Sequence, residues 1–139
     1  MRATAIEPVK NADIIMPAYD PNDAAPELLL TDLQQGRVNL QWQRKTGADS
    51  YRVTVWPASG STSLRRSWDV QETGPTVQLS ADQRMDLANW LATAVQSGTT
   101  MNWRVDCWNS TDDASVRAAP AEGDVNRFVI GVMPPGTPQ

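Results

Sequence analysis

Paired carboxylates are the groups in this sequence whose spacing comes closest to that of a catalytic site. Three pairs occur: Asp20 with Asp23, Asp82 with Asp86, and Asp112 with Asp113. Two carboxylates can act together as general acid and base. Each pair also has a structural explanation, because acidic residues favour turns and the first turn of a helix. The chain has no histidine, which excludes Ser-His and Cys-His nucleophile pairs. We therefore expect no catalytic residues and no enzyme activity.

Metal and redox chemistry have little support in the sequence. Residues 19–23 offer oxygen ligands, but they lack the alternating spacing and the glycine of an EF-hand loop, so a turn is predicted there. Cys107 is the only cysteine, so no intrachain disulfide can form. It shares the inward parity of Met101 and Trp103, which predicts a buried, unreactive thiol. We expect no metal site and no cofactor.

Size and charge narrow the possible partners. The 139 residues correspond to one domain, and 12 basic against 16 acidic residues give a net charge of −4. This charge argues against nucleic acid or an anionic membrane as a partner. No apolar run approaches the roughly 20 residues that span a bilayer. The first eight residues lack the apolar region of a secretory signal, so we expect synthesis in the cytoplasm without export.

Tryptophan and arginine form the most informative pattern, since the chain has six tryptophans and one phenylalanine. Alternation along two predicted strands places several of them opposite the core. The candidate contact residues of this outer face are Arg52, Trp56, Trp68, Arg104 and Trp108. Three interpretations remain open: a cation–π stack within the chain, a protein contact surface, and a platform of flat rings for a sugar.

The two ends of the chain differ from its middle. Four prolines interrupt residues 1–27, which predicts an extended N-terminal arm. Its short apolar stretch, Ile14, Ile15 and Met16, is a candidate docking anchor for a partner. Residues 132–139 contain three prolines and one glycine and predict an extended tail.

The middle of the chain alternates between apolar and polar residues in short runs. Strands are predicted over residues 28–30, 38–43, 51–56, 66–70, 76–79, 101–107 and 127–130. One segment differs, because the apolar residues within 80–95 recur with helical spacing. Ser80 and Gln83 have the spacing of a capping box, which predicts the start of this helix. The helix should join strands of opposite sheets and cover an open end, with Trp90 and Leu91 sealing the core.

Three of these segments resemble strands of the fibronectin type III family: residues 38–42, 48–55 and 97–105. Trp42 stands where the family has its core tryptophan, and Tyr51 stands at the position of a family tyrosine. Met101 replaces a tyrosine that the family usually has, so the hydrogen bond of that corner is absent. The resemblance covers residues 28–131 and implies an all-β, antiparallel immunoglobulin-like sandwich, here with one inserted helix and the N-terminal arm.

Fold alone does not give function, so the functional expectation rests on the arm and the outer face. Small proteins of this kind without an export signal suggest a structural, non-enzymatic component of a larger assembly, such as a phage virion. Capsid decoration, head-fibre and tail-associated proteins fit, with capsid or tail proteins as partners. The alternative is an adhesion module that binds a glycan or a protein through exposed tryptophans.

Overall fold

The fold consists of two β-sheets and two helices. The computed structural model describes residues 6–59, 64–72, 74–109 and 121–131. Its elements in chain order are η1 (Asn11–Asp13), β1 (Ile14–Met16), β2 (Glu27–Leu28), α1 (Leu30–Gln35), β3 (Gln41–Gln43), β4 (Ser50–Pro57), β5 (Arg66–Gln71), β6 (Thr76–Gln78), α2 (Ala81–Ala94), β7 (Thr100–Trp108) and β8 (Asn126–Ile130). The prediction of a mostly β protein compatible with a sandwich is confirmed.

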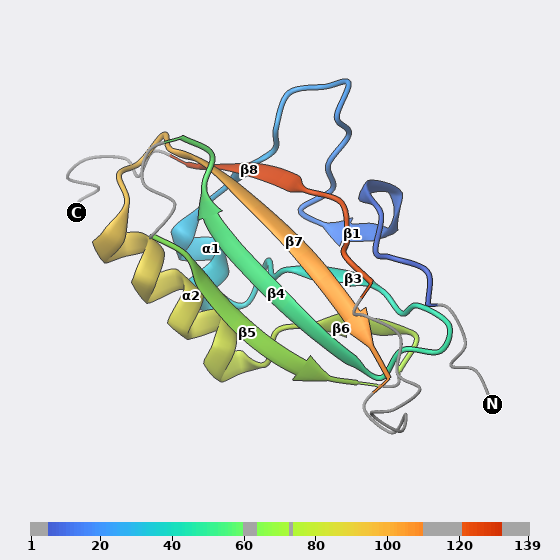
Figure 1. Ribbon diagram of the computed structural model, residues 1–139. Coiled ribbons are helices and arrows are strands. Elements are labelled where there is room, and N and C mark those ends of the chain that lie inside the picture. The colour runs from blue at the N-terminus through green and yellow to red at the C-terminus, as the bar shows by residue number, and fades with distance from the viewer. Residues whose placement is uncertain (1–5, 60–63, 73, 110–120, 132–139) are drawn as a thin grey trace.

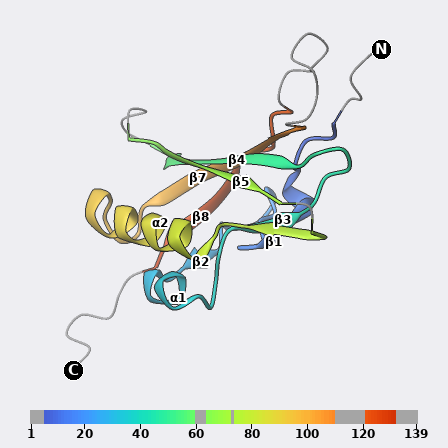
Figure 2. The ribbon, with the colours of Figure 1, turned by 90° about the horizontal axis from the view of Figure 1, so that it is seen from below.

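The larger sheet has the strand order β2-β8-β7-β4-β5, and the smaller sheet has the order β1-β3-β6. The long strands β4 and β7 run antiparallel side by side at the centre of the larger sheet (Figure 1). Seen from below, the larger sheet forms one layer. The smaller sheet and both helices lie together on one side of it (Figure 2). Within the described residues, no helix or strand covers the opposite face of the larger sheet.

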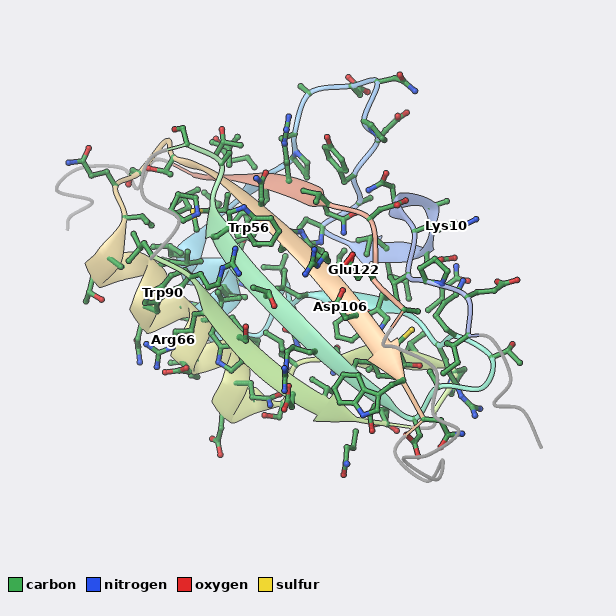
Figure 3. All side chains as sticks on the ribbon, viewed as in Figure 1. Lys10, Trp56, Arg66, Trp90, Asp106 and Glu122 are labelled. Carbon is green, nitrogen blue, oxygen red and sulfur yellow. The ribbon has the colours of Figure 1, made fainter. Side chains whose placement is uncertain are left out.

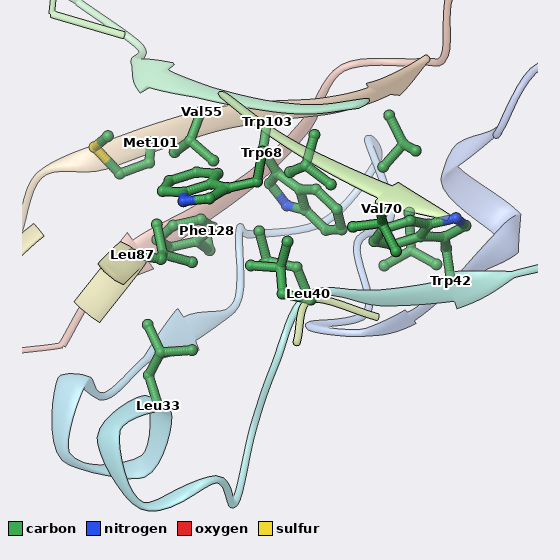
Figure 4. Close-up of a cluster of buried hydrophobic side chains, with 14 of the residues drawn as sticks. Leu33, Leu40, Trp42, Val55, Trp68, Val70, Leu87, Met101, Trp103 and Phe128 are labelled. Atoms are coloured by element: carbon green, nitrogen blue, oxygen red, sulfur yellow. The ribbon is translucent and has the colours of Figure 1, made fainter. Parts of the chain in front are cut away.

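The core lies between these layers. Trp42, Tyr51, Trp103 and Phe128 are fully buried, and the Trp42 and Tyr51 rings meet edge to face with centroids 5.6 Å apart. Figure 4 shows Trp103 and Phe128 beside the Leu87 side chain of α2, and Trp42 further along the interior. The alternation read along β4 and β7 therefore sends one set of side chains into the core and the other set to the outer face.

Helix α2 confirms the prediction for residues 80–95. The Ser80 hydroxyl accepts from the Gln83 amide at 3.1 Å, and the Gln83 side chain accepts from the Ser80 amide at 3.0 Å, which is the expected capping box. The helix connects β6 of the smaller sheet with β7 of the larger one. Trp90 and Leu91 are buried, as expected for residues that close the core.

Helix α2 also covers the β5 edge of the larger sheet (Figure 1). The Gln83 side-chain amide donates to the Asp69 carbonyl at 2.7 Å, and the Trp68 indole N–H donates to the Asp86 carboxylate at 2.8 Å. Arg66 reaches the same carboxylate at 3.0 Å. Side chains of the helix thus form hydrogen bonds with polar groups of β5, an edge strand that has a partner strand on one side only.

The region around residues 28–30 differs from the sequence prediction. The strand is shorter and ends at Leu28, and Leu30 begins helix α1. Leu30 and Leu33 are both buried, and the three consecutive leucines divide between the end of a strand, the N-cap residue and the first residue of the helix. Gly36 ends the helix with φ of 79°, and Arg84 from α2 donates to the Leu33 and Gln34 carbonyls at its C-terminus. The prediction of one inserted helix is wrong, because this second helix precedes the first long strand.

The pairing of β2 with β8 is parallel, unlike every other strand pair in the described residues. The fully antiparallel sheet expected from the sequence is therefore incorrect at this edge. The backbone explains the difference, since residues 17–26 bring the chain from the smaller sheet to the far edge of the larger one. No helix in the described residues is long and apolar enough to cross a membrane.

The N-terminal arm is part of the sandwich over the residues that the structure describes. Strand β1 pairs antiparallel with β3, placing Ile14 opposite Trp42. Val9 is fully buried. The prolines at positions 8 and 17 leave eight residues between them, which suffices for a short helical turn and a three-residue strand. An extended arm separate from the domain is thus not what residues 6–27 form, and the predicted tail lies outside the described residues.

Candidate interaction surface

The outer face of the larger sheet brings together four of the five residues predicted for it, namely Arg52, Trp56, Arg104 and Trp108. The register aligns Arg52 of β4 with Asp69 of β5 on one side and with Asp106 of β7 on the other. Arg52 donates to both carboxylate oxygens of Asp69, at 2.7 and 3.1 Å. The hydrogen bond from Arg52 holds the pKa of Asp69 below its usual value. Both side chains are about half exposed, at 52% and 57%, so solvent screens the pair.

Two tryptophans lie on this face, each next to an arginine. The Arg52 guanidinium lies 5.8 Å from the Trp108 ring centroid, and that of Arg65 lies 5.6 Å from the Trp56 ring. Figure 3 shows Trp56 over β4 and Asp106 further along the sheet. The geometry confirms a cation–π arrangement within the chain at both ends of the face. It leaves the contact interpretation open, since both rings are only half buried.

Other charged and amide side chains of the face also lie close to one another. Arg104 lies 3.1 Å from the Asp106 carboxylate, and Arg127 donates to the Asn102 side chain at 3.1 Å. The Asp106 carboxylate in turn accepts from the Gly123 amide. Opposite charges and amides therefore lie side by side on this face, and the buried Nε atom of Arg104 is near Asp106 without a hydrogen bond to it.

Trp68 does not belong to this face. It pairs in register with Val53, is 7% exposed, and its ring meets Trp90 edge to face at 6.3 Å. Trp56 and Trp108 are aligned six residues apart along β4, a separation of about 20 Å at the usual strand rise. The structure thus does not assemble the three rings Trp56, Trp68 and Trp108 into one platform.

The apolar stretch of the N-terminal segment divides between core and surface. Ile14 is buried, so it anchors its own domain and cannot serve as a free docking residue. Ile15 is 37% exposed, and Met16 is half buried. Alternation along β1 explains this division, because successive side chains point to opposite faces of a strand.

A charged contact that sequence analysis missed fixes this segment to the domain. The Lys45 ammonium lies 2.8 Å from Asp13 and 3.6 Å from Glu7. The side chains of Lys45 and Asp13 are only 11% and 19% exposed. Burial by itself would raise the pKa of Asp13, but the hydrogen bonds from Lys45 and the Lys10 amide and the two lysine charges together outweigh it, and the pKa is lowered. Burial would lower the pKa of Lys45, but its hydrogen bonds to Asp13 and Glu7 and the charges of both carboxylates together leave it raised.

Asn11 makes the second polar attachment of the segment. Its side-chain amide donates to the Asn126 side chain at 2.8 Å and to the Val125 carbonyl at 3.0 Å. Asn126 is fully buried. The sequence gives no sign of either attachment, because Lys45 lies in a predicted turn and the asparagines are more than a hundred residues apart.

Cys107 is buried, as expected from its parity. The thiol lies under the N-terminal segment, 3.5 Å from the Glu7 carbonyl oxygen. Burial raises the pKa of this thiol to about 11, so it remains protonated at neutral pH. The expectation of a thiol of low reactivity is consistent with this environment.

The carboxylate pairs have structural partners where the structure describes them. Asp86 binds Arg66 and Trp68, while Asp82 lies in the first turn of α2. The turn predicted at residues 19–23 is confirmed, since the Asp20 side chain accepts from the Asn22 amide at 2.9 Å. The third pair, Asp112 with Asp113, lies outside the described residues.

Shallow hollows lie beside both sheets in the described part of the chain. One, of about 290 Å³, lies between β1 and residues 18–24, and another, of about 350 Å³, lies between β5, β6 and the start of α2. Their linings combine carboxylates, amides and hydroxyls. Among the described residues, His, Cys, Asp and Glu form no cluster of three or more that could hold a metal ion. Comparison of the chain with protein-family models, curated proteins and solved structures found no match.

Proposed function

We propose that this chain is a non-enzymatic interaction domain that attaches to a larger protein assembly through the outer face of its five-stranded sheet. The observation that carries the proposal is the pair of half-buried tryptophans, Trp56 and Trp108, each next to an arginine on one regular surface. Tryptophan and arginine dominate the binding energy of protein interfaces. Side chains that are already held by partners lose less conformational entropy on binding.

We also propose an immunoglobulin-like, fibronectin type III-related topology for the sandwich. When β2 is set aside, β1, β3 and β6 correspond in chain order to strands A, B and E of such a fold. Strands β4, β7 and β8 then correspond to C, F and G, and β5 extends that sheet beside C. The two sheets divide the strands in the way this fold requires, which supports the assignment.

A phage virion is the assembly that we propose, with capsid or tail proteins as partners. The proposal follows from the resemblance to phage and bacterial fibronectin type III domains. In this setting the outer face would make the main contact, and Ile15 and Met16 would add a smaller apolar one. Ile14 has no part in it, since it lies in the core.

Incorporation into particles tests the proposal. Mass spectrometry of gradient-purified particles, from cells that carry the gene, should find the chain at a fixed ratio to capsid or tail proteins. The double variant Arg52→Ala/Trp108→Ala should remain folded and lose about tenfold or more of its incorporation, as expected for a hot spot. Arg37→Ala removes the ion pair between Arg37, which follows α1, and Asp32 of α1, and is the matched control.

Two results would contradict the proposal. One is a chain that is absent from the particles. The other is a folded outer-face double variant that is incorporated at the wild-type ratio, which would show that the face makes no contact.

A further inference from the structure

The N-terminal segment, residues 6–16, is held to the domain by contacts that lie far along the chain. Asp13 and Glu7 contact Lys45, Asn11 contacts residues 124–126, and the Val9 carbonyl accepts from the Asp124 amide at 2.9 Å. The segment also covers Cys107. We call the residues that receive it, 41–45, Cys107 and 124–126, the acceptor surface.

The hinge loop, residues 17–26, connects the segment to the rest of the domain and adds little to this attachment. Figure 1 shows it as a loop that extends away from the sheets. In the described structure, the hydrogen bonds of residues 17–25 stay within the loop, and only at Pro26 does the Val129 amide bond to it. The loop carries three prolines, at positions 17, 21 and 26, and a turn at residues 20–23.

From this arrangement we propose that the acceptor surface is an interaction site for the N-terminal segment of a second copy of this chain. Copies would then be joined by exchange of β1, with each segment completing the small sheet of its neighbour. Every contact of the segment would be remade between chains, because none of them depends on the hinge loop. The outer face takes no part, so this inference is independent of the proposed function.

Charge complementarity identifies the occupant. Lys45 is nearly buried and needs a carboxylate beside it, since an unpaired buried charge is strongly unfavourable. The acceptor surface also needs an amide that can reach Asn126 and an apolar side chain opposite Trp42. The segment supplies these groups as Asp13, Asn11 and Ile14, and a second copy supplies them in the same order.

Concentration decides between the closed and exchanged forms. A segment tethered by a short linker has an effective concentration in the millimolar range, so a dilute chain closes on itself. Exchange becomes competitive when copies are concentrated to a similar level or when the closed contact is weakened.

A charge swap tests the exchange on the full chain. Asp13→Lys and Lys45→Asp each place like charges together, both in a closed monomer and in an exchanged dimer of one variant. In an exchanged dimer of the two variants, both contacts are restored. Each variant alone should react at Cys107 at least about tenfold faster than wild type with a thiol reagent. An equimolar mixture should regain slow labelling and show a mixed dimer by native mass spectrometry.

The double variant Asp13→Lys/Lys45→Asp is the matched control, because its charges are restored within one chain. It should be a protected monomer when dilute. If this control folds and the mixture of single variants still labels rapidly without a mixed dimer, the proposal is overturned.

A second measurement applies even if the swapped charges do not fold. A protease site inserted between Ala24 and Ala25 allows the folded chain to be cut in the hinge loop. The cut protein is unfolded in guanidinium and refolded with excess fluorescent peptide of residues 1–24. We expect the peptide to be retained on the domain in gel filtration and an Asp13→Lys peptide to be retained at least about tenfold less. Equal retention of both peptides, or retention of neither, would overturn the proposal.

Discussion

The outer face and the N-terminal attachment both pair a basic side chain with an aspartate, but in different surroundings. Arg52 and Asp69 make two hydrogen bonds in the open, whereas Lys45 and Asp13 meet where little solvent reaches them. The exposed pair has the better geometry, yet water offers each partner a good alternative. The sheltered pair has fewer alternatives, so its loss should cost more. Placement, rather than hydrogen-bond geometry, therefore decides which pair holds the fold together.

The largest effect on stability should come from Ile14, the core residue next to Asp13 of the sheltered pair. Ile14→Ala should lower the free energy of unfolding by about 2–4 kcal/mol, because a buried isoleucine leaves a cavity. Ile15→Ala is the control on the adjacent residue and should change it by less than about 0.5 kcal/mol. Urea unfolding followed by tryptophan fluorescence measures both. Similar values for the two variants would contradict the division of β1 between core and surface.

Removal of the lysine should have the next largest effect. Lys45→Ala should lower the free energy of unfolding by about 2 kcal/mol, since Asp13 is left without its main partner. This value lies between those typical of surface and of buried ion pairs. Asp13→Asn keeps the shape and removes the charge, and it should cost about as much. Urea unfolding again gives the values. A double variant that costs as much as the two single variants together would argue against direct coupling of the pair.

The pH dependence of stability should separate the two regions. The pKa of Asp13 is lowered in the folded state, so its contribution is present above the unfolded value and is lost as pH falls through the folded one. The pKa of Lys45 is raised, so its contribution is complete below the unfolded value and is lost as pH rises through the folded one. We expect hydrogen exchange of residues 6–16 to accelerate relative to β4 below about pH 4 and above about pH 10.

Salt sharpens this test. The Asp69 pKa is lowered too, so the exposed pair also contributes to the loss of stability in acid. In 1 M salt the screening length falls to about 3 Å, which should remove most of the contribution of the Arg52–Asp69 pair. The acid sensitivity that survives in salt should disappear in Asp13→Asn and persist in Asp69→Asn. The opposite outcome would place the important pair on the outer face.

The smallest effect should come from the exposed pair itself. Arg52→Ala should change the free energy of unfolding by about 0.2–1 kcal/mol, because solvent replaces its contacts with Asp69 and Trp108. Thermal unfolding by circular dichroism measures the change, and Arg37→Ala is again the control. A loss equal to that of Lys45→Ala would remove the difference between the two regions.

The sequence predicts the long strands and α2 well, because alternation and helical spacing are local properties. It does not predict which side of the sheet receives Trp68, since the partner of its indole N–H, Asp86, comes from a helix 18 residues away. It also misses Lys45, because nothing in a turn shows that two acidic residues from another segment will cover it. The sequence predicts Leu30 in a strand although it begins α1, since a short apolar run fits both a strand and a helix.

The cover that α2 provides over β5 has a consequence for the behaviour of the protein at high concentration. An uncovered edge strand offers free backbone groups to other chains and promotes aggregation. Here Gln83 takes the Asp69 carbonyl, and the helix lies along the same edge. Growth of the larger sheet by addition of foreign strands is therefore hindered on that side. Loss of the Gln83 side chain should show itself first as precipitation on concentrating the protein, before any large fall in melting temperature.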